Sequence, residues 1–200
     1  MTVRLAVLLS GSGRTLQNFI DQTAAGRLDA SIEVVVASNP RAGGIAKAQA
    51  AGLPVAVIDR RDFASDEAFS DAITAVIDRH AVDLVLLAGF LRRYLFPARL
   101  KGRVLNIHPG LLPKYGGKGM YGHHVHEAVL AAGDAESGCT VHVADLEYDQ
   151  GPIVLQKRVP VLPGDTPETL AERVLAAECE AYPEAVRLVA ARLARSQPIT

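Results

Sequence analysis

The stretch Val104-Leu105-Asn106-Ile107-His108-Pro109-Gly110-Leu111-Leu112-Pro113 decides the fold, because it joins a buried strand to an abrupt stop. Its apolar residues predict a strand, and Asn106 and His108, two positions apart, project from the same face of that strand. Pro109 has no backbone N–H and a fixed φ, so the strand ends directly after His108. An amide and an imidazole therefore lie at the carboxyl end of a strand, where open α/β sheets bind ligands. A lone histidine in such a place is more often structural than functional, so the rest of the sequence has to decide.

Length, composition and charge are those of an ordinary globular protein, with 200 residues, 49% hydrophobic, 22% charged and a net charge of −1. This length suits one domain over residues 1–200, and the charge gives no footprint for nucleic acid or an anionic membrane. Cys139 and Cys179 are the only cysteines, so a disulfide framework or a cysteine-based zinc site is not expected. The apolar run at residues 3–9 is too short for a secretion signal or a membrane span, and we expect a cytoplasmic protein.

Short apolar runs rich in Val, Ile and Leu alternate with segments of helical period, which is typical of βαβ units around a parallel sheet. The predicted strands are residues 3–9, 32–37, 55–58, 84–88, 104–108, 140–143 and 153–160. The predicted helices are residues 16–24, 44–51, 66–80, 125–132 and 166–193. The expected fold class is therefore α/β, with a doubly wound, mostly parallel, Rossmann-like sheet.

The pattern changes after residue 104. The last two predicted strands are joined by a short polar loop, residues 145–151, which leaves no room for a crossover helix. An antiparallel hairpin should therefore follow the parallel part. The long alanine-rich segment opened by Thr166-Pro167-Glu168 predicts a final C-terminal helix.

The first predicted strand leads into the turn Ser10-Gly11-Ser12-Gly13-Arg14-Thr15, which opens a helix. Glycines let a ligand approach the backbone, and the N–H groups of a helix start favour an anion. A dinucleotide fingerprint would need a glycine in place of Leu16 and an acidic residue near Ser38, so a monophosphate is favoured over NAD. Arg14 and Thr15 can add a charge and a donor, although a tight turn without a ligand is the plain alternative.

Six segments together resemble the phosphoribosylglycinamide formyltransferase family, within the folate-dependent formyltransferases. The pairing of an Asn-x-His-Pro strand end with a later Asp-x-Gly-Pro loop is typical of that superfamily, and the opening Ser-Gly-Ser-Gly points to this branch. The segments are Ser10-Gly11-Ser12-Gly13, residues 87–92, Asn106-Ile107-His108-Pro109, Leu111-Leu112-Pro113, residues 139–142 and Asp149-Gln150-Gly151-Pro152. The resemblance implies transfer of the formyl group of 10-formyltetrahydrofolate to the amine of glycinamide ribonucleotide in purine synthesis.

The resemblance also implies that Asn106, His108 and Asp149 form the catalytic triad. Formyl transfer passes through a tetrahedral oxyanion, and the Asn106 amide and the His108 imidazolium can both donate hydrogen bonds to such an oxygen. A carboxylate within a few ångströms favours the charged imidazole, so we expect Asp149 to raise the pKa of His108. Read without the resemblance, Asp149 is as well explained as a turn residue before Gly151 and Pro152.

The remaining site residues are also carried over from the resemblance. Glu178, which could equally be an ordinary exposed helix residue, matches an acid near the ribose and glycinamide end of the substrate. His142 is a secondary site residue or a structural strand histidine, and the arginines after residue 91 are ligand contacts or solvated charges. The expected substrate phosphate ligands are Gly13, Arg14 and Thr15, and the expected folate ligands are Leu91, Arg92, Arg93, Tyr94 and Asn106. The resemblance also implies small-molecule substrates, no nucleic acid or membrane partner and no metal. We expect a monomer or a homodimer.

Three segments depart from the family pattern. Residues 93–97 are one residue longer than the common Arg-x-Leu-Ser-Pro, and Asp66 stands where many members place an arginine that reaches the folate. Residues 116–122 form a glycine-rich insertion, so the loop over the substrate can close differently. His123, His124 and His126 follow this insertion, but they lack a carboxylate or cysteine at a spacing that is recognised for metal sites.

Two other functions remain open at this point. The same triad could activate water and hydrolyse 10-formyltetrahydrofolate, in which case formate is released without the ribonucleotide. The chain could also be a non-catalytic nucleotide-binding or sensory module in which His108 is structural. That alternative predicts no folate affinity and little effect of His108→Ala on ligand binding.

Overall fold

The computed structural model describes residues 2–195. Its strands follow the order β3-β2-β1-β4-β5-β6-β7 in one sheet. The residue contacts divide the chain into two compact units, the first ending at Leu105 and the second beginning at Asn106. The pairs β1–β2, β1–β4 and β2–β3 are parallel, whereas β6–β7 is antiparallel. The predicted α/β class, with a mostly parallel sheet and a late antiparallel hairpin, is confirmed.

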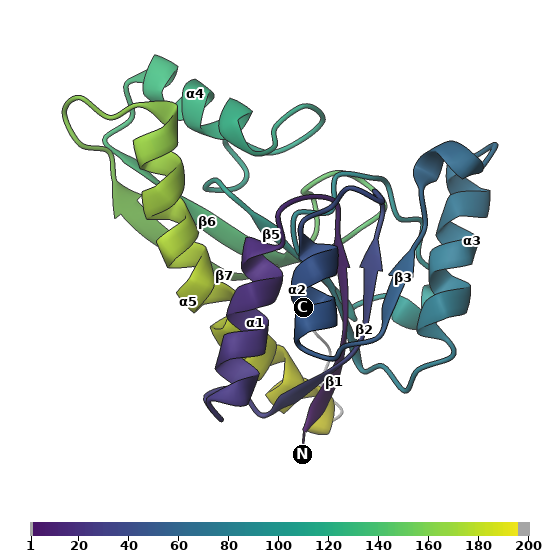
Figure 1. Cartoon of the computed structure of the whole chain (residues 1–200). Coiled ribbons are helices and arrows are strands. Elements are labelled where there is room, and N and C mark those ends of the chain that lie inside the picture. The colour runs from purple at the N-terminus through teal and green to yellow at the C-terminus, as the bar shows by residue number, and fades with distance from the viewer. Residues whose placement is uncertain (1, 196–200) are drawn as a thin grey trace. The chain divides into compact units, whose positions relative to one another are not determined.

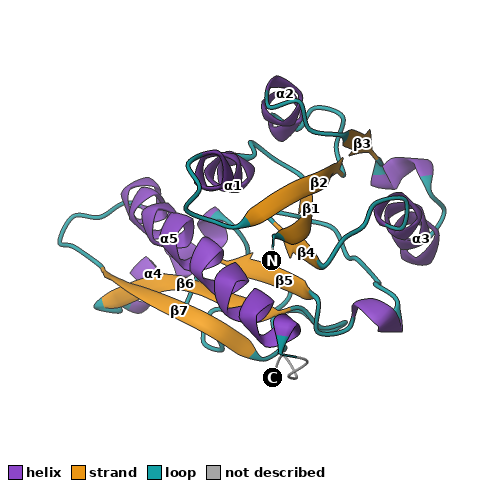
Figure 2. Cartoon of the chain, turned by 90° about the horizontal axis from the view of Figure 1, so that it is seen from below, coloured by secondary structure: helices purple, strands orange, loops and turns teal. Residues whose placement is uncertain are grey.

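The first unit is built around β1, which pairs with β2 on one side and β4 on the other. Residues 5–9 of β1 are completely buried, as expected for a parallel strand covered on both faces. Figure 2 shows α1 and α2 over one face of this part of the sheet and α3 over the other. The elements are β1 (Val3–Leu9), α1 (Arg14–Ala24), β2 (Ala30–Ala37), α2 (Gly44–Ala50), β3 (Val55–Val57), η1 (Arg60–Asp62), α3 (Asp66–Ile77), β4 (Leu84–Leu87) and η2 (Ala98–Leu100).

The second unit is a hairpin covered by a long helix. It contains β5 (Val104–His108), whose first two residues belong to the first unit, α4 (His123–Ala132), β6 (Glu136–Val143), β7 (Ile153–Pro160) and α5 (Pro167–Ala194). Figure 1 shows α5 running along β6 and β7, against which it packs. The helix starts in a capping box formed by Thr166 and Thr169, and its buried face includes Leu170, Val174 and Tyr182. Burial of each such large apolar side chain contributes about 1.5–3 kcal/mol to folding.

The structure shifts several predicted bounds. Helix α4 begins at His123, before the predicted residue 125, and α3 ends at Ile77, before the predicted residue 80. Strand β6 begins at Glu136, four residues before the predicted start at residue 140. Ser137 and Gly138 weaken the strand pattern in the sequence, but pairing with Val159 and Arg158 of β7 extends the strand through them.

Ser137 and Gly138 provide a matched test of packing in β6. A Cβ at Gly138 would lie 2.0 Å from the carbonyl oxygen of Lys157, so we expect Gly138→Ala to destabilise the fold by about 1–3 kcal/mol or more. The buried Ser137 hydroxyl has no hydrogen-bond partner among the described residues, so Ser137→Ala should leave stability unchanged or raise it. Urea unfolding of both variants measures these changes, and equal destabilisation by the two would contradict the packing described.

Candidate functional site

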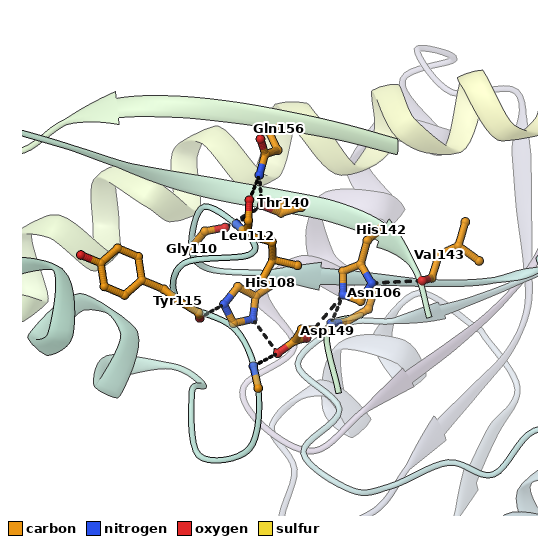
Figure 3. Close-up of polar contacts among 11 residues, drawn as sticks. Asn106, His108, Gly110, Leu112, Tyr115, Thr140, His142, Val143, Asp149 and Gln156 are labelled. Carbon is orange, nitrogen blue, oxygen red and sulfur yellow. Dashed lines mark hydrogen bonds and ion pairs between the residues drawn. The ribbon is translucent and has the colours of Figure 1, made fainter. Parts of the chain in front are cut away.

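The carboxyl end of β5 places Asn106 and His108 in one polar cluster, drawn in Figure 3. His108 is only 3% exposed. Its Nε2 lies 2.6 Å from the carbonyl oxygen of Tyr115, to which it donates, and its Nδ1 lies 3.6 Å from Oδ2 of Asp149. Both ring nitrogens therefore face oxygen atoms that can only accept hydrogen bonds. Sequence reasoning missed the Tyr115 carbonyl, because a backbone group leaves no mark in the residue types.

Asp149 lies at the centre of this cluster, with its backbone in a left-handed conformation at φ 57°. Its Oδ2 accepts a hydrogen bond from the N–H of Gly117 at 2.9 Å, and its Oδ1 lies 3.5 Å from Nε2 of His142. Burial alone would raise the pKa of Asp149, but its polar contacts with His142 and Gly117 and the nearby His108 outweigh it. The pKa of this carboxyl is lowered overall, so Asp149 is an anion at neutral pH.

His142 fixes the orientation of the Asn106 amide. Its Nδ1 lies 3.1 Å from the carbonyl oxygen of Val143, which can only accept, so this nitrogen carries a hydrogen. Its Nε2 then accepts a hydrogen bond from Nδ2 of Asn106 at 3.0 Å. One hydrogen of the Asn106 amide is used in this way, and the second can be directed to a ligand.

The charge state of His108 differs from the sequence-based expectation. We expected Asp149 to raise the pKa of His108, but burial lowers it below its ordinary value more strongly than Asp149 and the Tyr115 carbonyl raise it. The electrostatic effect of Asp149 has the expected sign, and it is smaller than the effect of removing the ring from water. His108 is thus a weaker base and, once protonated, a stronger acid than a free histidine.

The turn after β5 is tied to the hairpin by two residues that the sequence analysis did not single out. Thr140 on β6 donates from its hydroxyl to the carbonyl oxygen of Gly110 at 2.7 Å, and the Thr140 hydroxyl oxygen accepts from the N–H of Leu112 at 3.1 Å. Gln156 on β7 donates to both Thr140 and Leu112. The sequence predicted the hairpin but not its register, which pairs Thr140 with Gln156 and makes this contact possible.

In the first unit, the turn at Gly13 forms the start of α1. Gly13 has a φ of 71°, and a Cβ there would lie 2.4 Å from Cα of Gly44, so packing against α2 already requires a glycine. Arg14 and Thr15 occupy the first positions of α1. Among the described residues, no side chain caps this helix start and no acidic residue lies in its first turn, an arrangement that favours an anion.

Two serines join the first turn to the segment after β4. The hydroxyl groups of Ser10 and Ser38 lie 2.6 Å apart, and the N–H of Leu91 donates to Ser10 at 2.9 Å. Both serines are buried, whereas the Leu91 side chain is 58% exposed.

The predicted folate residues after Leu91 differ in exposure. Tyr94 is buried, and its hydroxyl lies 3.0 Å from that of Thr74, so its ring belongs to the core of the first unit. Burial raises the pKa of Tyr94 to about 12. Arg92 and Arg93 are exposed. The pKa of Asp59 is lowered chiefly by its hydrogen bond from Arg61 and less by Arg92, and the pKa of Glu67 is lowered chiefly by a hydrogen bond from its own backbone and less by Arg93.

Two acidic residues of the sequence analysis have different surroundings. Glu178 lies on α5, close enough to the buried Cys139 to contribute to the rise of its thiol pKa to about 12, which burial chiefly causes. Asp66, at the position where many relatives are expected to have an arginine, accepts a hydrogen bond from Arg60 at 2.7 Å. Arg60 also donates to the carbonyl oxygen of Phe63, so Asp66 serves to hold a local turn.

The three histidines of α4 have separate surroundings. Within residues 2–195, no three His, Cys, Asp or Glu side chains come together in a way that could hold a metal ion. His124 lies 3.3 Å from Glu127, while His126 is buried and its ring packs edge-on against that of His123. The same described part of the chain contains no helix long and apolar enough to cross a membrane.

Comparison with known proteins identifies the family. The family model described as formyl transferase matches residues 3–186. The chain belongs to the formyl transferase family. The match runs through both units and includes every candidate residue from Gly13 to Glu178.

Members of the formyl transferase family resemble this chain over most of its length. It is 39% identical over 186 residues to the phosphoribosylglycinamide formyltransferase of Haemophilus influenzae, covering 92% of this chain and 85% of that protein. The crystal structure of glycinamide ribonucleotide transformylase 1 from Symbiobacterium toebii superposes with a TM-score of 0.88 at 38% identity, covering 96% of this chain and 89% of that one. The phosphoribosylglycinamide formyltransferase of Brucella melitensis superposes with a TM-score of 0.85 at 43% identity, and the match covers 95% of this chain and 97% of that one.

Longer proteins contain a similar segment. The trifunctional purine biosynthetic protein adenosine-3 of Bos taurus is 42% identical over 194 residues, which cover 96% of this chain but 19% of that protein. The chain spans 14% to 19% of the length of the animal trifunctional proteins it matches.

The buried His126 predicts an acid-sensitive fold. Burial, with His123 and His108 nearby, lowers the pKa of His126 from 6.5 to about 4, so folding favours its neutral form. The unfolded chain binds this proton first, and stability is therefore lost as pH falls from 6.5 towards 4. We expect His126→Leu to make the free energy of unfolding depend less on pH over that range, as measured by urea unfolding.

His124→Leu, on the exposed side of the same helix, is the matched control and should keep the wild-type slope. His108 and Asp149 also have lowered pKa values, so both variants keep the part of the stability loss at low pH that these two groups cause. Parallel curves for wild type and His126→Leu would show that His126 does not cause the pH dependence.

Proposed function

We propose that this chain is a phosphoribosylglycinamide formyltransferase, which transfers the formyl group of 10-formyltetrahydrofolate to the amine of glycinamide ribonucleotide. The observation that carries this proposal is the cluster of Asn106, His108 and Asp149 at the end of β5, in a chain of the formyl transferase family. Two named relatives of similar length, from Haemophilus influenzae and Brucella melitensis, support the choice of substrate.

Asn106 would stabilise the charge that develops during transfer. The amine of the ribonucleotide attacks the formyl carbon, the C=O bond opens to a tetrahedral oxyanion, and the bond to the folate nitrogen then breaks. The Asn106 amide, held by His142, has a second hydrogen for this oxyanion and needs no change of protonation to donate it. A donor fixed before the reaction costs little reorganisation when the charge appears.

His108 would act as the acid and Asp149 as its charge partner. Its lowered pKa favours release of a proton, which the departing folate nitrogen requires. A developing oxyanion nearby would raise the pKa of His108 and promote its protonation, and the anionic Asp149 at 3.6 Å would stabilise the imidazolium. The proton lost by the attacking amine can then return to the leaving nitrogen through this group.

The other candidate residues would bind the two substrates. Gly13, Arg14 and Thr15 at the start of α1 suit the ribonucleotide phosphate, and Glu178 suits its glycinamide end. The segment from Leu91 to Tyr94 would contact the folate through exposed side chains and backbone groups, since the Tyr94 ring is buried. This chemistry needs only small-molecule substrates and no metal, and it suits a cytoplasmic enzyme, monomeric or dimeric, made of one domain.

Substitution of the triad tests the catalytic assignment. We expect His108→Asn and Asp149→Asn each to lower kcat by at least about 100-fold, because each removes the proton donor or its charge partner. Thermal unfolding and circular dichroism should show that the fold is kept. Exchange of the exposed His124 on α4 for Asn serves as the control, and near-wild-type turnover in either triad variant would refute the assignment.

Substitution of Arg14 tests the phosphate site. We expect Arg14→Ala to raise the KM for glycinamide ribonucleotide about tenfold, with a much smaller change in the KM for 10-formyltetrahydrofolate. The reason is that the phosphate belongs to only one of the two substrates. Arg79→Ala, at an exposed position just after helix α3, is a control for removal of a positive charge. Equal changes in both KM values would argue against phosphate binding at this turn.

An assay with and without the acceptor separates transfer from hydrolysis. The proposed function requires that loss of 10-formyltetrahydrofolate depends on glycinamide ribonucleotide and yields its N-formyl product. Release of formate at the same rate without the acceptor would identify a hydrolase instead. Lack of folate binding in equilibrium dialysis would support a non-catalytic module.

A further inference from the structure

The side chain of Gln156 reaches from β7 to the turn that follows His108, as Figure 3 shows. Its Nε2 lies 2.9 Å from the carbonyl oxygen of Leu112 and 2.9 Å from the hydroxyl oxygen of Thr140. A carbonyl oxygen can only accept a hydrogen bond, so the amide nitrogen must be the group that faces it. Gln156 therefore donates to the turn as well as to its partner on the neighbouring strand.

Thr140 completes this connection. It lies directly opposite Gln156 in the hairpin and is fully buried. Its hydroxyl donates to the Gly110 carbonyl and accepts from the Leu112 N–H. Thr140 and Gln156, which we call the turn clasp, thus satisfy three backbone groups of the turn: two carbonyl oxygens and one N–H.

The clasped turn borders the His108 ring directly. A Cβ at Gly110 would lie 3.1 Å from Nε2 of His108, so the Cα of Gly110 faces this edge of the ring with no room for another carbon between them. The same nitrogen donates to the Tyr115 carbonyl, which lies further along the segment. Any displacement of the turn must therefore move the ring or alter its hydrogen bond.

We propose that Gln156 is a positioning residue for His108, acting through Thr140 and the turn at residues 110–112. Without the Gln156 amide, the buried Leu112 carbonyl loses a donor, and the turn relaxes to recover one. The ring then leaves the position between Tyr115 and Asp149 from which it donates its proton. The kinetic part of this inference rests on the proposed function, whereas the geometric part concerns the His108 ring alone.

Gln156→Leu is the first test, since leucine fills a similar space and donates no hydrogen bond. We expect kcat to fall by about tenfold or more, while the KM values of both substrates change by less than about threefold. The NMR titration of the His108 ring, assigned by its loss in His108→Asn, should shift its midpoint. Arg158→Ala, two residues further along β7 at an exposed position, should leave both readouts unchanged.

A double-mutant cycle connects Gln156 to Thr140. If both act on the same turn, Thr140→Val combined with Gln156→Leu should lower kcat little further than the more damaging single change. Thr140→Ser keeps the hydroxyl and should retain most of the activity. Gln156→Glu keeps the size of the side chain and replaces the donating nitrogen, so it provides the same test should Gln156→Leu fail to fold.

The outcomes are distinct. A wild-type kcat and His108 titration in the folded Gln156 variants would overturn the proposal, as would independent, multiplicative effects of the two clasp substitutions. An effect of Arg158→Ala equal to that of Gln156→Leu would also overturn it. If the wild-type protein transfers no formyl group, the proposed function fails, and the titration of the His108 ring still decides whether Gln156 positions it.

Discussion

The contacts of the Asp149 carboxylate, whose side chain is 11% exposed, are the interactions on which the candidate site depends. The two oxygen atoms of this carboxylate face His108, His142 and the N–H of Gly117, which come from three separate segments of the second unit. A buried anion without partners would be very unfavourable, so these groups must stay together as long as Asp149 is ionised. One charge thereby fixes two histidines and the start of the glycine-rich loop.

This arrangement gives the two histidines different roles. His142 binds through both nitrogens to fixed partners, which is typical of a residue that orients its neighbours. His108 faces acceptors on both sides but is held in its neutral form by burial, so it gains from any event that protonates it. The difference arises from the surroundings of two identical side chains, and it could not be read from their positions in the sequence.

Much of the fold followed from the sequence because its elements have strong local signals. Strands β1, β5 and β7 have the predicted bounds, since each is a continuous apolar or alternating run with a clear stop. The start of β6 was missed because pairing with β7, and not local preference, extends it through Gly138. In the site, residue types and a family resemblance located Asn106, His108 and Asp149. The carbonyl of Tyr115, the N–H of Gly117 and the net effect of burial on His108 depend on tertiary packing, which no local pattern encodes.

The contact between Gly13 and Gly44 has a consequence for how first turns of this kind are interpreted. A methyl group at Gly13 would overlap the backbone of α2, so selection for a stable fold retains this glycine even in a chain that binds no anion. At Gly11, by contrast, an added Cβ would meet no atom within 4 Å. Steric crowding inside the protein gives no reason to keep a glycine there. Among descendants of this sequence that had lost their substrate, substitutions would therefore accumulate at position 11 before position 13. Loss of the first glycine would indicate loss of the ligand, and loss of the second would indicate a change in packing.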